Sequence, residues 1–503
     1  MVKKKFYVTT PIYYPSGKPH IGSVYTTIAA DVLSRWYKLL GYEVFFLTGT
    51  DEHTKKVLVE ADKNGKNVNN YLDEITKVFK KTFESLDINY DRFIRTSDED
   101  HKKFVQYILN VINKKGDIYK GKYEGYYCNE CEDYYTEREA SKLICPIHGK
   151  NLEFLKEDSY FFKLSKYKDK LLDFYEKNPN FISPEYRRSE IINRVKEGLR
   201  DLSISRKDLN WGIEIPFDKE HRVYVWFDAL NNYLTGVGVL NDKKLFKKFW
   251  PADLHIVGKD ILWFHSVIWP AILISAGYKI PKKIYAHGWL TSNDKKIGKS
   301  LGNADDIEEL IKKYGSDSIR YFLFKVIPFG EDGEYSEKNL IERNNELANK
   351  LGNLVSRVSS LVEKKGIEKS KNKLFKKSYL KKISWLIENL EFDKALNEIF
   401  AFVDICNEYI QKKKPWDTGD PENSLEFSGL QKIQNEKRLS EARKVLYELA
   451  DSIKIIAILL WPFIPNTCEK IAKNFSFKID YSEINKTISV KKIRKEENLF
   501  KRV

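Results

Sequence analysis

Short apolar runs alternate with amphipathic segments over the first 115 residues, which predicts alternating strands and helices. Phe6–Thr10 and Glu43–Leu47 are rich in aromatic and β-branched residues, as buried strands are. Apolar residues recur at helical spacing over Ile21–Leu40. Further helices are expected over 68–86 and 101–114. This strand–helix–strand order predicts a parallel sheet with helices on its faces.

The alternation breaks from about residue 115 to 221, where short strands, aromatic residues and a group of cysteines follow one another. It resumes with Val223–Asp228 and continues through a strand at Leu254–Gly258, a helix over 260–276 and a strand at Lys283–Gly288. The two halves therefore predict one doubly wound, Rossmann-like α/β sheet that an insertion splits.

From about Leu340 the chain is expected to be almost wholly helical. Leu347, Leu351, Leu354 and Val358 form one apolar stripe at helical spacing. Further helices are predicted over 376–389, 392–413 and 439–460. The lysine-rich segment after residue 475 is expected to be peripheral.

The chain is basic, with 87 Lys and Arg against 72 Asp and Glu and a formal net charge of +15. Such a surplus favours a polyanionic partner such as nucleic acid. A lysine-rich chain can also reflect the nucleotide bias of its genome, so charge alone leaves this open. The N-terminal residues lack a signal peptide, and the apolar run Ile455–Leu460 is too short to cross a bilayer. We expect a cytoplasmic protein without membrane contact.

Two glycine-containing motifs carry groups suited to phosphate. His20-Ile-Gly-Ser23 lies where a loop meets a helix, and a helix N-terminus offers N–H groups and a positive dipole end. Lys296-Ile-Gly-Lys-Ser300 places two lysines three positions apart in a predicted loop. His20 alone would more often be a capping or core residue, and the lysines alone a solvated loop. Together the motifs predict a nucleotide-activating enzyme.

Four residues have the spacing of a closed tetrahedral zinc site: Cys128-x2-Cys131-x13-Cys145-x2-His148. Thiolate and imidazole ligands favour Zn²⁺ over hard cations. Because the four positions are all occupied by protein ligands, one structural ion per chain is predicted. The other two cysteines of the chain lie in apolar helical segments and are expected to be core residues.

Several motifs, in this order, resemble the class I aminoacyl-tRNA synthetases, and the methionyl-tRNA synthetase family in particular. The resemblance covers nearly the whole chain. Pro19-His-Ile-Gly22 looks like the HIGH motif, with Ser23 in place of its second histidine, and the 296–300 segment is a KMSKS variant. The other matching segments are Tyr7–Tyr14, Phe46–His53, Val223–Ala229 with Tyr233, His255–Asp260 with Phe264 and His265, and Asn353, Arg357 and Lys414–Trp416.

The resemblance implies a ligase that uses ATP to convert L-methionine to methionyl-adenylate. The enzyme would then transfer methionine to the 3′-terminal adenosine of tRNA(Met), including the initiator tRNA. Mg²⁺ is expected with the ATP. His20, Lys296 and Lys299 are the implied catalytic groups, which neutralise phosphate charge in the transition state.

The resemblance also implies the binding residues. The ATP-binding residues would be His20, Gly22, Ser23, Gly258, Asp260, Lys296, Lys299 and Ser300. The methionine-binding residues would be Ile12, Tyr14, Asp51, Trp226, Ala229, Tyr233, Phe264 and His265. Asp51 would hold the ammonium group, although it could instead cap the following helix. An aromatic slot suits a thioether, because sulfur–aromatic contacts are favourable.

Asn353, Arg357 and Trp416 would read the anticodon, by base-edge hydrogen bonds and by stacking. On this resemblance, 1–115 and 222–282 form the catalytic domain, and 116–221 is a connective insertion with the zinc knuckle. Residues 283–340 form a stem-contact region containing the KMSKS motif, and 341–503 form an α-helical anticodon-binding domain. Dimeric members often carry an extra C-terminal domain, so a monomer is expected.

Other interpretations stay open. A class I synthetase for another apolar amino acid would share the fold, although such enzymes are usually far longer. A non-catalytic tRNA-binding paralogue would keep the helical domain and lose the active-site groups. A zinc-finger nucleic-acid module would not need the split sheet. Amino-acid-dependent ATP–pyrophosphate exchange separates these possibilities.

Overall fold

The structure, a computed structural model, describes residues 3–128, 133–135, 143–145, 149–207, 209–292, 295–297, 305–418, 429–489, 493–494 and 499–500. At 133, 134, 292, 295, 296, 429, 431 and 432 it describes the backbone alone.

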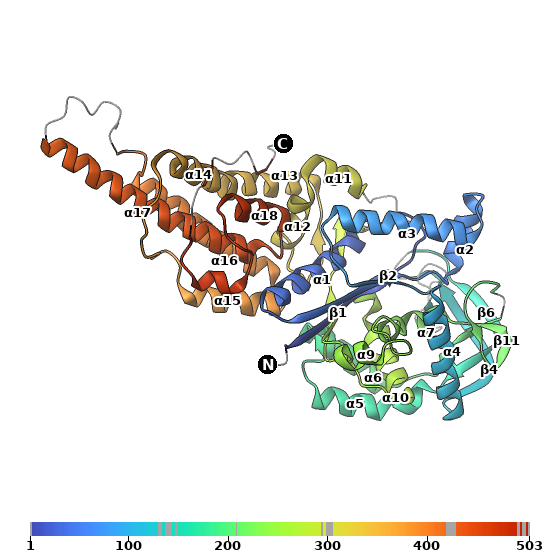
Figure 1. Cartoon of the computed structure of the whole chain (residues 1–503). Helices are drawn as coiled ribbons and strands as arrows, with labels where there is room; N and C mark the ends of the chain where they lie inside the picture. The colour runs from blue at the N-terminus through green and yellow to red at the C-terminus, as the bar shows by residue number, and fades with distance from the viewer. Residues whose placement is uncertain are drawn as a thin grey trace.

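A six-stranded parallel sheet organises the N-terminal two thirds of the chain (Figure 1). Every pairing in it is parallel, which confirms the predicted Rossmann-like architecture. Its strands are, in spatial order, β3 (Arg92–Arg95), β2 (Glu43–Thr50), β1 (Lys5–Tyr13), β12 (Leu254–Gly258), β13 (Ile284–His287) and β7 (Ile182–Ser183).

Alternate residues of each strand pack into two different cores. Phe6, Val8 and Phe46 share a core with helices α1 (Ile21–Leu39) and α3 (Val68–Ser85). Tyr7 and Leu47 point to the opposite face, where α4 (Glu99–Lys114) and α10 (Trp269–Ala276) pack. Successive side chains of a strand point to opposite faces, so a strand buried on both faces reads as a continuous apolar run.

Two segments of the sheet differ from the predictions. Val223–Asp228 is not a strand of the main sheet: β11 (Asp218–Val223) belongs to a separate three-stranded sheet, and α7 (Val225–Leu230) follows it. The edge strand β7 lies inside the range predicted for the insertion, yet it pairs with β13. At two residues β7 is too short to produce a recognisable apolar pattern.

The range between the two halves of the sheet forms a smaller antiparallel layer. A four-stranded sheet has the order β5–β4–β6–β8, and the three-stranded sheet has the order β10–β11–β9. The strand bounds are β4 (Ile118–Cys128), β5 (Asp133–Tyr135), β6 (Glu153–Phe162), β8 (Leu202–Ser203), β9 (Ser205–Arg206) and β10 (Glu214–Ile215). Helices α5 (Lys168–Lys177) and α6 (Glu185–Glu197) complete this region.

The C-terminal part is helical, as predicted. Its helices are α13 (Glu337–Glu346), α14 (Asn353–Lys365), α15 (Lys377–Glu388), α16 (Phe392–Lys413), α17 (Gly429–Leu460) and α18 (Pro465–Asn474). The segment after residue 475 is not peripheral throughout: Ile484, Ile488 and Ile493 are at most 6% exposed and belong to the core shared with α17. Its many lysines conceal this spaced set of apolar residues.

Short elements connect these layers. They are α2 (Lys55–Lys63), α8 (Asn232–Thr235), α9 (Lys243–Phe249), α11 (Ile307–Tyr314), α12 (Ser316–Lys325), β14 (Leu290–Ser292), β15 (Lys295–Lys296) and β16 (Gly333–Glu334). Among the helices of the described ranges, none combines the length and the apolar character that a membrane span requires.

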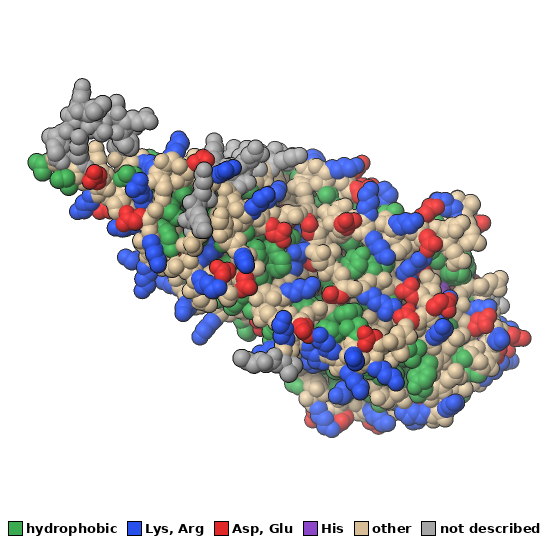
Figure 2. Space-filling model, in the orientation of Figure 1, with side chains coloured by type: hydrophobic (Ala, Val, Ile, Leu, Met, Phe, Trp, Pro, Cys, Tyr) green, Lys and Arg blue, Asp and Glu red, His purple; other side chains and the backbone are tan. Residues whose placement is uncertain are grey.

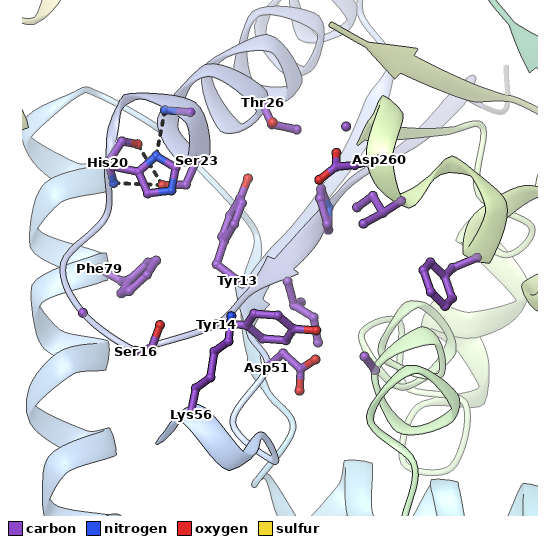
Figure 3. Close-up of a pocket in the computed structure, with 18 of the residues that line it drawn as sticks. Tyr13, Tyr14, Ser16, His20, Ser23, Thr26, Asp51, Lys56, Phe79 and Asp260 are labelled. Carbon is purple, nitrogen blue, oxygen red and sulfur yellow. Dashed lines mark hydrogen bonds between the residues drawn. The ribbon is translucent and has the colours of Figure 1, made fainter. Parts of the chain in front are cut away.

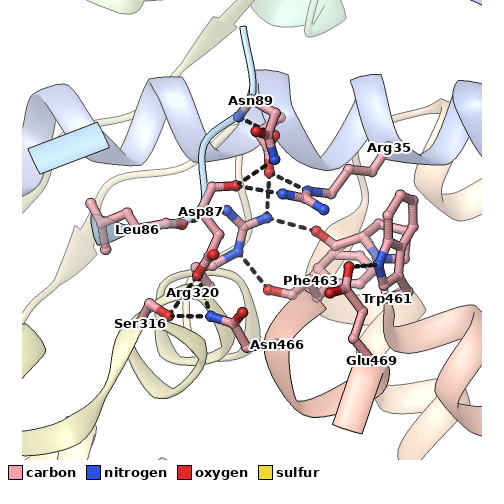
Figure 4. A network of polar contacts seen from close by, with 12 residues as sticks. Arg35, Leu86, Asp87, Asn89, Ser316, Arg320, Trp461, Phe463, Asn466 and Glu469 are labelled. Atoms are coloured by element: carbon pink, nitrogen blue, oxygen red, sulfur yellow. Dashed lines mark hydrogen bonds and ion pairs between the residues drawn. The ribbon is translucent and has the colours of Figure 1, made fainter. Parts of the chain in front are cut away.

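A buried arginine joins the sheet to the helical domain (Figure 4). Arg320 of α12 is fully buried and donates to Asp31 of α1 at 2.6 Å. It also donates to three backbone carbonyls, those of Leu86, Pro462 and Phe463. Burial would raise the pKa of Asp31, but Arg35 and Arg320 hold it below its ordinary value. The guanidinium thus ties α1, the end of α3 and the α17–α18 turn together.

We predict that Asp31→Asn lowers the free energy of unfolding by about 3–5 kcal/mol, because Arg35 and Arg320 would be left buried without their carboxylate. Urea unfolding followed by tryptophan fluorescence measures the change. Asp173→Asn is the matched control, since Asp173 pairs with Lys177 on the surface, where an ion pair is worth about 1 kcal/mol or less. Equal midpoints for the two variants would contradict the prediction.

Candidate active site

One pocket of about 960 Å³ opens at the carboxyl ends of β1, β2, β12 and β13 (Figure 3). Ligands of open α/β sheets bind at this edge, because the loops there carry polar groups and helix N-termini. The pocket is lined by thirteen of the predicted site residues: Ile12, Tyr14, His20, Gly22, Ser23, Asp51, Trp226, Ala229, Tyr233, Gly258, Asp260, Phe264 and His265.

His20 caps the helix that starts at this pocket. Its Nδ1 accepts the N–H of Gly22 at 3.1 Å. Ser23 completes the cap, since its hydroxyl accepts the N–H of His20 at 3.0 Å and donates to the carbonyl of His20 at 2.8 Å. A Cβ on Gly22 would lie 2.9 Å from the His20 ring, so only glycine fits here without a shift of the ring. His20 is therefore both a capping residue and a pocket residue.

Asp51 follows the end of β2 and is 2% exposed. Its N–H donates to the carbonyl of Tyr13, which fixes it beside β1. It does not cap the next helix, because the Thr54 side chain accepts the N–H of Val57 at the start of α2. The carboxylate therefore lines the pocket, as Figure 3 shows, instead of serving a helix.

Aromatic rings form the opposite wall. Trp226 of α7 and Phe264 stack with centroids 3.8 Å apart and planes 7° from parallel. Phe264 and His265 belong to a π-helical turn, Phe264–Ile268, within the segment predicted as one continuous helix. π-Helical turns are frequent at functional sites, because the extra residue redirects neighbouring side chains. Here the turn contributes two residues to the pocket.

The ring of His265 is neutral and has a defined tautomer. Its Nδ1 is 2.9 Å from the carbonyl of Ile261, so Nδ1 carries the hydrogen and Nε2 accepts from the Tyr233 hydroxyl at 2.7 Å. Burial lowers the pKa of His265 to about 4, despite the nearby Ile261 carbonyl and Asp260. His255, whose ring centroid lies 4.2 Å from that of Tyr233, also has a lowered pKa because of burial and the neighbouring His265.

A second network lies behind the pocket and was missed by the sequence analysis. The buried carboxylate of Asp228, on α7, contacts His53 Nδ1 and His101 Nε2, each at 2.7 Å. Burial would raise the pKa of Asp228, but these two rings hold it below its ordinary value. The network fixes α7, with Trp226 and Ala229, to the segment that follows Asp51. The polar Asp228 within an apolar run was its one sequence signal.

The other side of the pocket carries Gly258, the last residue of β12, Asp260, just after that strand, and His287, at the end of β13. Asp260 accepts the indole N–H of Trp289 at 3.3 Å. His287 accepts the Thr26 hydroxyl at Nε2 and donates from Nδ1 to the Gly288 carbonyl, each at 2.7 Å. Sequence reasoning gave His287 no role, although it ends a predicted strand of the sheet.

Only part of the motif at residues 296–300 lies within the described residues. The backbone of Lys296 lies in β15 and pairs with Thr291 of β14, and Ile297 lines the pocket. The Lys296 side chain, Lys299 and Ser300 lie outside the described residues, so their predicted roles stay predictions.

Two of the four predicted zinc ligands are described. Cys128, at the end of β4, and Cys145 are each 1% exposed and share one small cluster with Leu152. Cys131 and His148 lie outside the described residues. Across the described ranges no group of three or more potential ligands forms a metal site. Cys406 and Cys468 are fully buried in helices, as expected, and burial raises the pKa of each thiol.

The helical domain brings two of its three predicted reader residues together. The Arg357 guanidinium of α14 lies 5.3 Å from the ring centroid of Trp416. Trp416 is 41% exposed, and Lys365 holds its backbone by donating to its carbonyl at 3.1 Å. Asn353 is exposed one helical turn before Arg357. The surface thus offers an aromatic face beside a guanidinium.

Comparison with known proteins decides the family. A family model of class I tRNA synthetases, type M, matches residues 6–153 and 141–359. A model of the anticodon-binding domain of tRNA ligases matches residues 376–502. The chain belongs to the methionyl-tRNA synthetase family of class I enzymes.

Curated methionyl-tRNA synthetases agree with this assignment. The methionine–tRNA ligase of Caldanaerobacter subterraneus is 45% identical over 95% of this chain and 75% of its own length. That of Thermotoga maritima is 42% identical over 94% of this chain and 76% of its own length.

Solved structures of the family agree as well. Mycobacterium tuberculosis methionyl-tRNA synthetase in complex with methionyl-adenylate is 36% identical, covers 99% of both chains and superimposes with a TM-score of 0.92. The free form of the same enzyme is 34% identical, and the match covers 100% of this chain and 98% of that chain. It superimposes with a TM-score of 0.84. The fold of this chain thus agrees better with the form that holds the reaction intermediate.

Proposed function

We propose that this chain is a methionine–tRNA ligase, which activates L-methionine with ATP and transfers it to the terminal adenosine of tRNA(Met). One observation carries the proposal. A helix-capping imidazole, a buried carboxylate and an aromatic slot converge from distant parts of the chain on one pocket at the carboxyl end of the sheet. The family assignment supports the same reaction.

Methionine is held at both ends in this proposal. Its ammonium group pairs with Asp51, whose burial makes the pairing strong, because charge-assisted hydrogen bonds gain strength away from water. Its side chain lies among Trp226, Phe264 and Tyr233, where the polarisable sulfur contacts aromatic rings. His265 is neutral at physiological pH, so it presents no cation to the apolar thioether.

ATP binds on the side of α1. Because Nδ1 of His20 accepts the N–H of Gly22, the neutral ring carries its hydrogen on Nε2 and donates to a phosphate oxygen. The methionine carboxylate then attacks the α-phosphorus, and pyrophosphate leaves. Such a reaction needs placement and charge neutralisation more than a covalent catalyst. Lys296 and Lys299 are proposed to neutralise the β- and γ-phosphates. Mg²⁺, bound with the ATP, would neutralise further phosphate charge.

The decisive experiment is amino-acid-dependent ATP–pyrophosphate exchange with methionine, leucine, isoleucine, valine and cysteine. We expect exchange with methionine alone. Asp51→Asn should raise the KM for methionine about 10- to 100-fold, the equivalent of losing a hydrogen bond to a charged group. Asp62→Asn, the same change at an exposed position of α2, should leave that KM unchanged. Exchange with another amino acid, or none, would overturn the proposal.

The anticodon of tRNA(Met) is proposed to bind the surface formed by Asn353, Arg357 and Trp416. An exposed indole accepts an unstacked base, and the neighbouring guanidinium and amide can bond to base edges. The Arg357–Trp416 contact supports this, because it holds both groups on one surface before any RNA binds.

We predict that Trp416→Ala raises the KM for tRNA about 5- to 150-fold and leaves ATP–pyrophosphate exchange nearly unchanged, since a stacked base contributes about 1–3 kcal/mol. Aminoacylation and exchange assays on the same preparation measure the two effects. Trp385→Ala removes an indole of α15 that is 56% exposed, somewhat more than Trp416, and should change neither rate. Loss of exchange together with charging in Trp416→Ala would contradict the separation of the two sites.

We also propose one structural zinc ion held by Cys128, Cys131, Cys145 and His148. The clustering of the buried Cys128 and Cys145 supports it, because two of the four predicted ligands then lie close together, as a shared metal ion requires. Bound zinc would link the two segments that carry its ligands and serve no catalytic step.

Elemental analysis should find one zinc per chain, and Cys145→Ser should lose it. Cys468→Ala, a change at a cysteine outside this cluster, should keep the full zinc content. Zinc retained in Cys145→Ser would rule the site out. The region boundaries, the monomeric state and the cytoplasmic location stay predictions.

A further inference from the structure

A second pocket, of about 460 Å³, lies at the opposite end of the sheet from the active site. It opens at the amino ends of β1, β12 and β13, and it is bounded by α1 and by the end of α15. We call it the amino-end pocket. It is lined by Lys4, Lys5, Phe6, Leu33, Tyr37, Tyr42, Asp253, Leu254, Lys282, Lys283, Glu388 and Leu390.

The rim of the amino-end pocket is cationic. Its four lysines come from two segments nearly 280 residues apart and face two carboxylates, which leaves a formal charge of +2. One of these carboxylates, Asp253, is already engaged by Lys282 at 2.6 Å and by the N–H of Tyr7 at 2.7 Å. Figure 2 shows further Lys and Arg side chains beside the N-terminus, over α9, whose sequence contains four lysines.

Two of the lysines are held at an energetic cost. Burial lowers the pKa of Lys5, Asp253 opposes this shift, and repulsion from Lys282 and Lys279 adds to it. Burial also lowers the pKa of Lys283. A bound anion would offset both effects, because it replaces the lost hydration and screens the repulsion.

One wall of the amino-end pocket is aromatic. Phe6 and Tyr37 stack at 3.7 Å, and Tyr42 meets Tyr37 edge-on at 5.1 Å. The ammonium group of Lys4 lies 5.6 Å above the Tyr42 ring. Leucines at 33, 254 and 390 add apolar surface. Inorganic phosphate would use the cations and leave this wall without a contact.

We propose that the amino-end pocket binds a nucleoside phosphate, with its phosphate among Lys4, Lys5, Lys282 and Lys283 and its base against the Tyr37–Tyr42 wall. The volume falls within the range of small-molecule sites, and lysines with aromatic rings are the usual partners of phosphates and bases. Because the last residue of α15, Glu388, and Leu390 just after that helix line the pocket, the ligand bridges the sheet and the helical domain. The same chemistry is presented by a free nucleotide and by the end of an RNA strand.

The test uses the full-length protein and a readout specific to each lysine, since nucleotides also enter the active site. Amine acetylation with and without guanosine monophosphate, followed by peptide mass spectrometry, measures the reactivity of every lysine. We expect at least 5-fold protection of Lys5 and Lys283 and none of Lys170 or Lys177 on α5. Parallel samples contain inorganic phosphate or a five-nucleotide single-stranded RNA.

Each outcome bears on the proposal. Protection by the mononucleotide, by the RNA or by both supports it and identifies the source of the ligand. Equal protection by inorganic phosphate would reduce the pocket to an anion site and overturn the nucleoside assignment. No protection by the mononucleotide or the RNA would overturn the site altogether.

A variant pair provides an independent check. Lys5→Gln/Lys283→Gln should raise at least 10-fold the mononucleotide concentration that protects the remaining pocket lysines, Lys4 and Lys282, from acetylation, and Lys170→Gln/Lys177→Gln should not. Both double variants should keep ATP–pyrophosphate exchange, which shows that they are folded. Tyr37→Leu keeps all four lysines. It should therefore weaken the binding of the mononucleotide and leave any binding of inorganic phosphate unchanged. Unaltered binding to Lys5→Gln/Lys283→Gln would also overturn the proposal.

Discussion

The position of helix α1 depends on one buried ion pair, and much of the molecule depends on α1. Asp31, near the middle of the helix, accepts from Arg320, and the same guanidinium holds the backbone of the α17–α18 turn. The N-terminus of α1 is the His20 cap in the active site. A buried guanidinium cannot release its acceptors without large cost, so the cap, the sheet and the helical domain keep one relative position. The surface proposed to read the anticodon is thereby held in a fixed position relative to the candidate active site.

Within the candidate active site, the groups proposed to bind the substrate are positioned by other side chains. Asp51 follows β2 and Trp226 lies on α7, more than 170 residues away, and the His53–Asp228–His101 network holds these two segments together. The Ser23 hydroxyl works in the same way, since both of its hydrogen bonds go to the backbone of His20. This explains how a serine can follow the glycine of the HIGH motif: it closes the cap that orients the imidazole.

The parts of this structure that sequence could predict are those governed by local rules. Helical periodicity placed α1 within one residue of its end, and the His20–Ser23 motif at the start of that helix located one side of the pocket. The errors came where distant contacts decide. Val223–Asp228 is apolar enough for a strand, but packing and hydrogen bonding made its second half the helix that carries Trp226. His101 meets Asp228 across 127 positions of the chain, a contact that no spacing within one segment predicts.

One rigid element connects the active site with the amino-end pocket. Helix α1 has 19 residues, so it is about 28 Å long. His20 stands before its first turn, and Tyr37, in its last turn, lines the amino-end pocket. A ligand of that pocket is therefore too far away to touch ATP. Any influence on activation would pass through α1 and the ion pair at its middle, which already fixes the helical domain. The two ends of the sheet are thus connected mechanically by the helix whose His20 cap is proposed to bind phosphate.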